Sequence, residues 1–113
     1  MGLGVNDVLK KYGKEGKVII TGQDATLEGV KAVYNGTMHM TIYHPHKTLG
    51  YKVADLINDM LKGANPKQLA NSETFNGLVA VPTFQVNSIA VTKDNITDVL
   101  IKNGEYTHEE IAN

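Results

Sequence analysis

Apolar residues recur three and four positions apart in several stretches of the chain, which is the spacing of one helix face. This pattern predicts helices over residues 3–12, 26–34 and 47–62. A further helix is predicted after Asp94, which can cap its first turn, and residues 107–111 can add one polar C-terminal turn. The strongest pattern belongs to 47–62, whose apolar positions are Leu49, Val53, Leu56, Ile57, Met60 and Leu61.

Two short segments carry the pattern of strands instead. Residues 17–21 form a continuous β-branched run, which predicts a central parallel strand covered on both faces. Residues 38–43 alternate, with Met38, Met40 and Ile42 on the more apolar face.

The second half of the chain gives weaker strand patterns. Residues 74–75 and 79–81 are weak strand candidates on either side of Asn76-Gly77, and Pro82 restricts any strand there to an edge. Residues 83–92 are rich in β-forming types, whereas 64–73 have the polar composition of a linker.

The order of these elements predicts an α/β fold, a Rossmann-like parallel sheet layered with helices and joined by right-handed crossovers. With 113 residues there is room for one domain. The first predicted element is a helix, without the strand that normally precedes it in such folds. We therefore expect this chain to be an incomplete lobe of a larger fold, or to receive an element from a partner.

Composition excludes several classes of function. The net charge is −1 and all eleven cationic side chains are Lys, without a basic run, so nucleic acid is not an expected partner. The chain has no Cys, which excludes disulfides, thiolate metal sites and thiol nucleophiles. No apolar stretch reaches membrane-spanning length, and the first residues carry no targeting signal.

Polar side chains follow both predicted strands of the first half. Gln23 and Asp24 come directly after 17–21, and His44 follows 38–43. Because the carboxyl ends of parallel strands meet at one edge, where ligands bind in open α/β sheets, we expect these residues to converge. A carboxylate beside an amide suits hydrogen bonding to vicinal hydroxyl groups. The alternative role for Asp24 is to cap helix 26–34, and the two roles are compatible.

The histidines invite a metal or acid–base hypothesis. Pro45 separates His44 from His46, and neither belongs to a recognised zinc motif, so we expect no metal site and no cofactor. His39 and His108 fit surface positions. One hypothesis for these residues is a small enzyme that uses Asp24, His44 and His46; it ranks third, after the two functions described below.

Several segments, in order, resemble the periplasmic-type sugar-binding proteins of bacterial ABC importers, the type I periplasmic binding proteins, and most of all their D-xylose-binding members. These segments are VIITGQDA, YNGT, MTIYHP, NGLVAVP and VTKDNI. Together with helix 47–62 they extend over nearly the whole chain.

The resemblance implies a receptor of two lobes that close on a sugar around a hinge. Residues 1–113 would form the C-terminal portion, with 47–63 as the helix that crosses to the other lobe and with the N-terminal lobe absent. Asp24 and Gln23 would bond sugar hydroxyls, and His44 would reach the ligand at the hinge. The D-xylose-binding members carry Lys at that position, and His changes the charge, reach and pH response.

The function implied is extracytoplasmic binding of a monosaccharide, a pentose such as D-xylose, for delivery to an ABC permease or a membrane sensor. We expect the isolated chain to bind little sugar, because half a cleft leaves the ligand in water. The second hypothesis is a sensing or assembly subunit that acts through protein contacts. A homodimer that exchanges helix 47–62 would support it.

Overall fold

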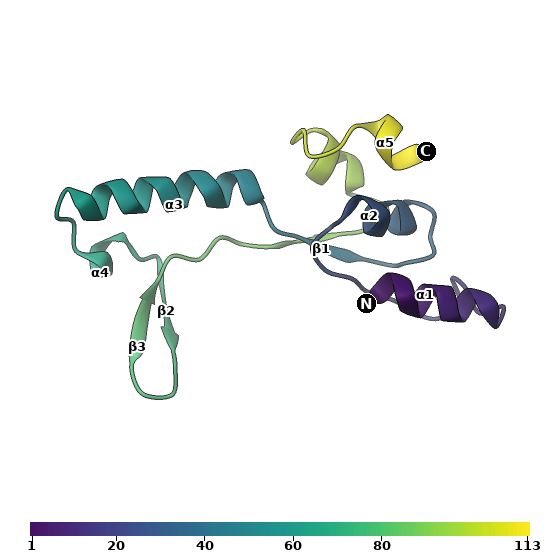
Figure 1. The fold of residues 1–113 in the computed structure, drawn as a ribbon, viewed down its shortest axis with the longest axis horizontal. Helices are drawn as coiled ribbons and strands as arrows, with labels where there is room; N and C mark the ends of the chain where they lie inside the picture. Colours follow the sequence, from purple (N-terminus) through teal and green to yellow (C-terminus); the bar gives the residue numbers. More distant parts are fainter. The chain divides into compact units, whose positions relative to one another are not determined.

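The structure is a computed structural model that describes residues 1–113. The chain divides into two compact units, one formed by Met1–His44 with Ser88–Asn113 and the other by Pro45–Asn87. It leaves the first unit after His44 and returns at Ser88 (Figure 1). Both candidate strand ends therefore belong to the first unit.

The first unit contains most of the predicted helices. Its elements are α1 (Gly2–Lys11), α2 (Leu27–Tyr34), β1 (Thr41–Tyr43), β4 (Ile89–Val91), the π-helix η1 (Thr97–Ile101) and α5 (His108–Ala112). The structure confirms three predicted elements to within one or two residues: the helices over 3–12 and 26–34 and the turn at 107–111.

The helix caps differ in part from the prediction. The Thr26 hydroxyl accepts the Gly29 N–H at 3.3 Å and caps α2, so the capping role considered for Asp24 is wrong. Asp94 does not cap η1 either. The neighbouring Asn95 side chain instead accepts the Thr92 N–H at 2.8 Å and turns the chain before the helix starts.

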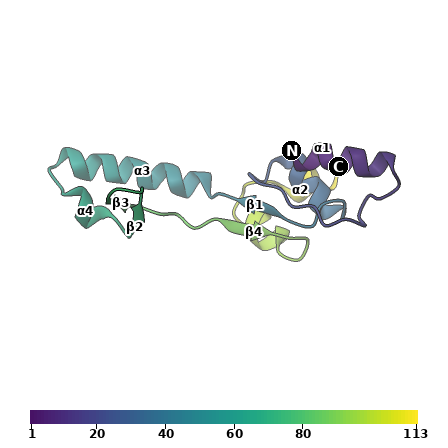
Figure 2. The same cartoon turned by 90° about the horizontal axis from the view of Figure 1, so that it is seen from below.

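The sheet of the first unit is small and mixed. β1 pairs antiparallel with β4, with Thr41 opposite Val91 (Figure 2). The expected parallel pairing of residues 17–21 is reduced to a single bridge between Thr21 and Met40, supported by the Gly22 N–H donating to the Met40 carbonyl at 2.8 Å. Helices and sheet together form an incomplete α/β lobe, as predicted.

Burial corrects two details of the strand predictions. Residues 17–21 are not covered on both faces, because only Ile20 turns to the core while Ile19 is 77% exposed. Along 38–43 the buried side chains are Met38, Thr41 and Tyr43, whereas Met40 and Ile42 are half-buried. Both hydroxyls find partners inside the unit, and a polar group with a partner can be buried at little cost.

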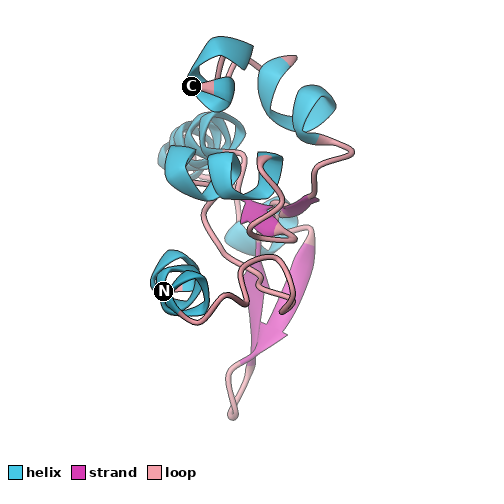
Figure 3. Ribbon diagram, turned by 90° about the vertical axis from the view of Figure 1, so that its right-hand side faces the viewer, coloured by secondary structure: helices cyan, strands magenta, loops and turns pink.

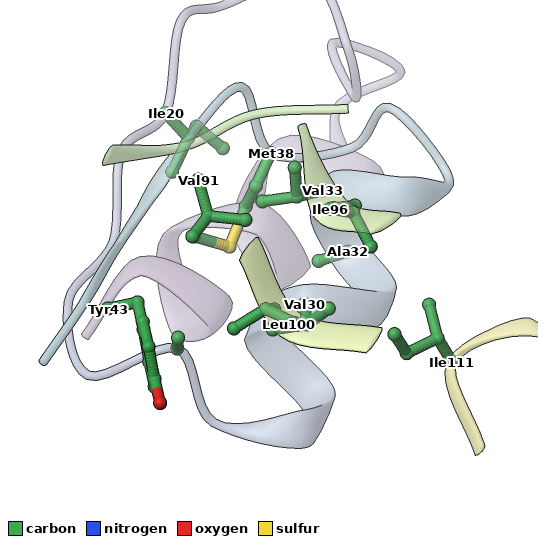
Figure 4. Close-up of a cluster of buried hydrophobic side chains, with 11 residues drawn as sticks. Ile20, Val30, Ala32, Val33, Met38, Tyr43, Val91, Ile96, Leu100 and Ile111 are labelled. Carbon is green, nitrogen blue, oxygen red and sulfur yellow. The ribbon is translucent and has the colours of Figure 1, made fainter. Parts of the chain in front are cut away.

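The core of the first unit lies where α2, β4, η1 and α5 meet (Figure 4). Val30 from α2 and Leu100 from η1 are completely buried at its centre. Ile111 anchors the short α5, whose first turn is held by a capping box between Thr107 and Glu110. This C-terminal segment therefore packs as a fixed part of the unit.

The second unit consists of a helix, a helical turn and a hairpin (Figure 1), and the hairpin is the pair of long magenta strands in Figure 3. Its elements are α3 (His46–Leu61), α4 (Pro66–Leu69), β2 (Ser72–Phe75) and β3 (Ala80–Thr83). Helix 47–62 is confirmed, and the linker over 64–73 is wrong because α4 and the start of β2 lie there. The β-rich segment 83–92 is a strand only at β4 and at its first residue, the end of β3.

Local chemistry explains the hairpin. The Asn76 side chain accepts the N–H groups of Leu78 and Val79 at 3.0 Å each, and Gly77 has a φ of 97°, which only glycine adopts at little cost. Pro82 lies opposite Glu73 in a sheet of two strands, where each strand is an edge, as the sequence predicts. Neither unit has a helix with the length and apolar character that crossing a membrane requires.

Candidate functional site

A tight loop follows Thr21 and carries the first candidate residues. Its start is fixed by the backbone, because the Gly22 carbonyl accepts the Ile42 N–H at 3.2 Å. Asp24 and Ala25 then both adopt positive φ angles, 75° and 44°. Residues other than glycine in this region cost of order 1–3 kcal/mol each, so surrounding contacts must hold the loop.

Two hydroxyl groups from distant segments hold this loop. The buried Thr41 Oγ1 accepts the Ala25 N–H at 3.2 Å, and the Tyr106 hydroxyl donates to the Ala25 carbonyl at 3.0 Å. Ala25 itself is buried, 2% exposed. The peptide groups on both sides of Ala25 are thus fixed, and they orient the neighbouring Asp24.

The structure brings Asp24 and His44 together. His44 Nε2 lies 3.8 Å from Asp24 Oδ1, and the two side chains are 35% and 65% exposed. The predicted convergence of these residues at one edge is confirmed. On its other side the His44 ring is hydrogen-bonded through Nδ1 to Ser88 Oγ at 2.8 Å, so the imidazole lies between the Asp24 carboxylate and the Ser88 hydroxyl.

An open cavity of about 670 Å³ lies beside Asp24. Gln23, Asp24 and Thr41 line it, together with the first residues of α1, and His44 lies outside its lining. Gln23 is exposed and faces this cavity from the same loop as Asp24. The volume is in the range of small-molecule sites, and the side chains of the lining offer hydroxyl, amide and carboxylate groups but no cation.

His46, the third residue of the enzyme hypothesis, is the first residue of α3 and belongs to the other unit. No three side chains of the His, Asp or Glu type gather closely enough to hold a metal ion.

Sequence reasoning missed four residues that shape the site. Thr41 and Tyr106 fix the loop, Ser88 holds His44, and Glu105 accepts the Tyr43 hydroxyl at 3.0 Å. Their types and spacing carry no motif. The pairing of β1 with β4, which aligns Tyr43 with Ile89, places Ser88 next to His44, but this register is visible only in three dimensions.

Replacing Thr41 with Val tests the loop support. The shapes are similar, but Val leaves the Ala25 N–H without its acceptor, so we expect a loss of about 1–3 kcal/mol in the free energy of unfolding. Urea titration followed by circular dichroism measures it. Thr48→Val on the exposed surface of α3 is the control and should stay within about 0.5 kcal/mol of the parent. Equal effects of the two substitutions would contradict the assigned role of Thr41.

The two inward-facing tyrosines predict sensitivity to alkaline pH. Burial, with Glu105 nearby, raises the pKa of Tyr43 and of Tyr106 above 10.0. The unfolded chain then loses these protons first, so the free energy of unfolding falls as the pH rises past about 10. Over this pH range we expect the free energy of unfolding to fall less for Tyr43→Phe than for Tyr12→Phe, which is the control at an exposed tyrosine. Urea titrations between pH 8 and 11 measure this, and identical profiles would refute it.

Comparison with known proteins identifies the family. The sequence profile described as "Periplasmic binding protein domain" matches residues 1–65, more than half of the chain. The chain belongs to this family. This periplasmic binding protein domain is 42% identical over 96% of its length to the D-xylose-binding periplasmic protein of Haemophilus influenzae, and 38% identical over 96% to that of Escherichia coli.

Solved structures agree with this assignment. A carbohydrate transporter solute binding protein from Chloroflexus aurantiacus, solved in complex with D-glucose, matches 93% of the chain with a TM-score of 0.77 and 26% identity. This periplasmic binding protein domain spans about a third of its relatives, 32% of both xylose-binding proteins and 31% of the solved chain. The family consists of binding proteins rather than enzymes, and its named relatives are periplasmic.

Proposed function

We propose that this chain forms the C-terminal part of an extracytoplasmic receptor for D-xylose that supplies an ABC importer. One observation carries the proposal: the Asp24 carboxylate stands at the edge of a polar cavity, 3.8 Å from the imidazole of His44. The identity to two D-xylose-binding periplasmic proteins supports the choice of sugar.

The chemistry of these residues suits a neutral ring with several hydroxyls. The Asp24 carboxylate accepts hydrogen bonds from two neighbouring hydroxyls, and the Gln23 amide both donates and accepts. His44 donates from its edge of the site. An anionic ligand fits poorly, because the lining has one carboxylate and no cationic side chain to balance a negative charge.

The cavity is open to solvent, and a second lobe is needed to close it. A sugar bound to these residues alone keeps much of its surface in water, where protein hydrogen bonds add little net free energy. We propose that the opposing surface comes from an N-terminal lobe and that an ABC permease receives the closed receptor.

Calorimetry with two proteins tests this function. One is the chain itself, and the other is a chimaera in which the H. influenzae relative supplies everything outside the matched 32% of its length. We expect the chimaera to bind D-xylose more tightly than ribose or glucose, and the chain alone to bind weakly or not at all. Micromolar binding by the isolated chain would refute the need for a second lobe. Absence of binding by a folded chimaera would refute the function.

The alternative is a sensing or assembly subunit that acts through protein contacts. The observation in its favour is an apolar row on α3, where Leu49, Val53, Ile57 and Met60 are each 43–50% exposed. Two copies that exchange α3 would cover this row. Light scattering tests it: a dimer at micromolar concentration supports the alternative, and a monomer at high concentration with α3 amides protected from exchange refutes it.

A further inference from the structure

We infer that Glu105 and Tyr106 are positioning residues for the sugar site. They act through Tyr43 and Ala25, the chain neighbours of His44 and Asp24. The inference rests on the proposed function, because it assigns a purpose to contacts at the rim that Asp24 and His44 form. The two adjacent residues come from the C-terminal segment, far along the chain from both strand ends.

Tyr106 acts on the Asp24 side. Its hydroxyl donates to the Ala25 carbonyl at 3.0 Å across 81 positions of sequence, while Thr41 binds the N–H of the same residue. Ala25 and Asp24 both have positive φ, a conformation that an unsupported loop leaves readily. The direction of the Asp24 carboxylate therefore depends on the hydroxyl of Tyr106.

Glu105 acts on the His44 side. Its Oε2 accepts the Tyr43 hydroxyl at 3.0 Å across 62 positions of sequence, and Tyr43 directly precedes His44 at the end of β1. Tyr43 is 5% exposed, so its ring and hydroxyl are both fixed. One dipeptide thus holds the residues next to both sugar-binding side chains, and the two sides of the rim keep a constant separation.

The segment that contains Glu105 and Tyr106 is itself rigid. It follows η1, whose Leu100 is fully buried, and precedes α5, whose Ile111 is 1% exposed and whose first turn has a capping box. The Glu105 N–H also donates to the Leu100 carbonyl at 2.9 Å. The segment is therefore built to hold position, which is the requirement for supporting residues behind a binding site.

A double-mutant cycle in the chimaera separates positioning from simple stabilisation. Tyr106→Phe keeps the ring and removes the hydroxyl, and we expect D-xylose affinity to fall about three- to thirtyfold, which lies within the wider range measured for residues coupled through contact. In the Asp24→Ala background the same change should alter affinity less than twofold. Equal losses in both backgrounds, or no loss in either, would overturn the inference. Tyr12→Phe, at an exposed tyrosine, is the matched control.

Conservative replacement tests Glu105 in the same chimaera. Glu105→Gln keeps a carbonyl oxygen that can accept the Tyr43 hydroxyl, so its D-xylose affinity should stay within about threefold of the parent chimaera. Glu105→Ala has no such acceptor, so its affinity should fall as far as that of Tyr106→Phe. If Gln and Ala have the same effect, the acceptor is not what positions β1.

Hydrogen exchange on the 113-residue chain needs no sugar and keeps this inference distinguishable from the proposed function. Tyr106→Phe should speed exchange of the Ala25 amide at least tenfold and leave the Val30 amide in the core unchanged, because only the loop is released. If the chimaera binds no sugar, the proposed function fails. If Ala25 exchange does not change, the positioning role fails, whether or not sugar binds.

Discussion

Replacing Asp24 with Ala is expected to lower the D-xylose affinity of the chimaera by about 10- to 150-fold. This range corresponds to a net loss of about 1.5–3 kcal/mol, the contribution of one hydrogen bond to a charged group, because 1.4 kcal/mol corresponds to a factor of ten. Asp24 is the anionic side chain of the cavity lining, and its contact with His44 also disappears on substitution. Titration calorimetry with D-xylose measures the change.

The control for this substitution is Asp94→Ala, at an exposed aspartate of the same unit that caps no helix. Its D-xylose affinity should match that of the parent chimaera within about twofold, because surface changes away from special contacts have small effects. If both aspartates had equal effects, the loss would reflect net charge rather than a contact with the sugar. If Asp24→Ala left the affinity unchanged, the assignment of the site would be wrong.

The largest expected effect on stability comes from Leu100→Ala. Leu100 is fully buried among side chains of α2 and α5, and truncation leaves a cavity in a small core. We expect the free energy of unfolding to fall by about 2–5 kcal/mol. Because a domain of this size has about 5–15 kcal/mol in total, this loss removes a large fraction of its stability. Urea titration of the chain measures this.

Leu78→Ala at the tip of the hairpin is the matched control, since Leu78 is 85% exposed. It should change the free energy of unfolding by less than about 0.5 kcal/mol. Where Leu100→Ala does not fold, Ile111→Val gives a milder test, with an expected loss of about 0.5–1.5 kcal/mol. Similar values for Leu78→Ala and Ile111→Val would contradict the location of the core.

The helices were predictable because their apolar spacing and ending residues act locally. The strands were predicted less well, because burial there depends on partners elsewhere in the chain. Thr41 and Tyr43 face the core because Ala25 and Glu105 bind their hydroxyls, whereas alternation alone favours the more apolar Met40 and Ile42.

The candidate site shows the same division. Asp24 and His44 could be paired from sequence, because each follows a segment with the pattern of a strand and the carboxyl ends of neighbouring parallel strands meet. Ser88 and Tyr106 could not be predicted in this way. Ser88 lies 44 positions along the chain from His44, and Tyr106 lies 81 positions from Ala25. Hydroxyl groups that support a loop have no spacing rule, so three-dimensional structure is needed to find them.

A crystal structure of the chimaera with D-xylose tests the central claim most directly. The sugar should occupy the cavity beside Asp24, with a carboxylate oxygen about 2.5–2.7 Å from a ring hydroxyl, the usual length of such a charge-assisted bond. Electron density for D-xylose elsewhere, with Asp24 facing solvent and bonded to no hydroxyl, would contradict it.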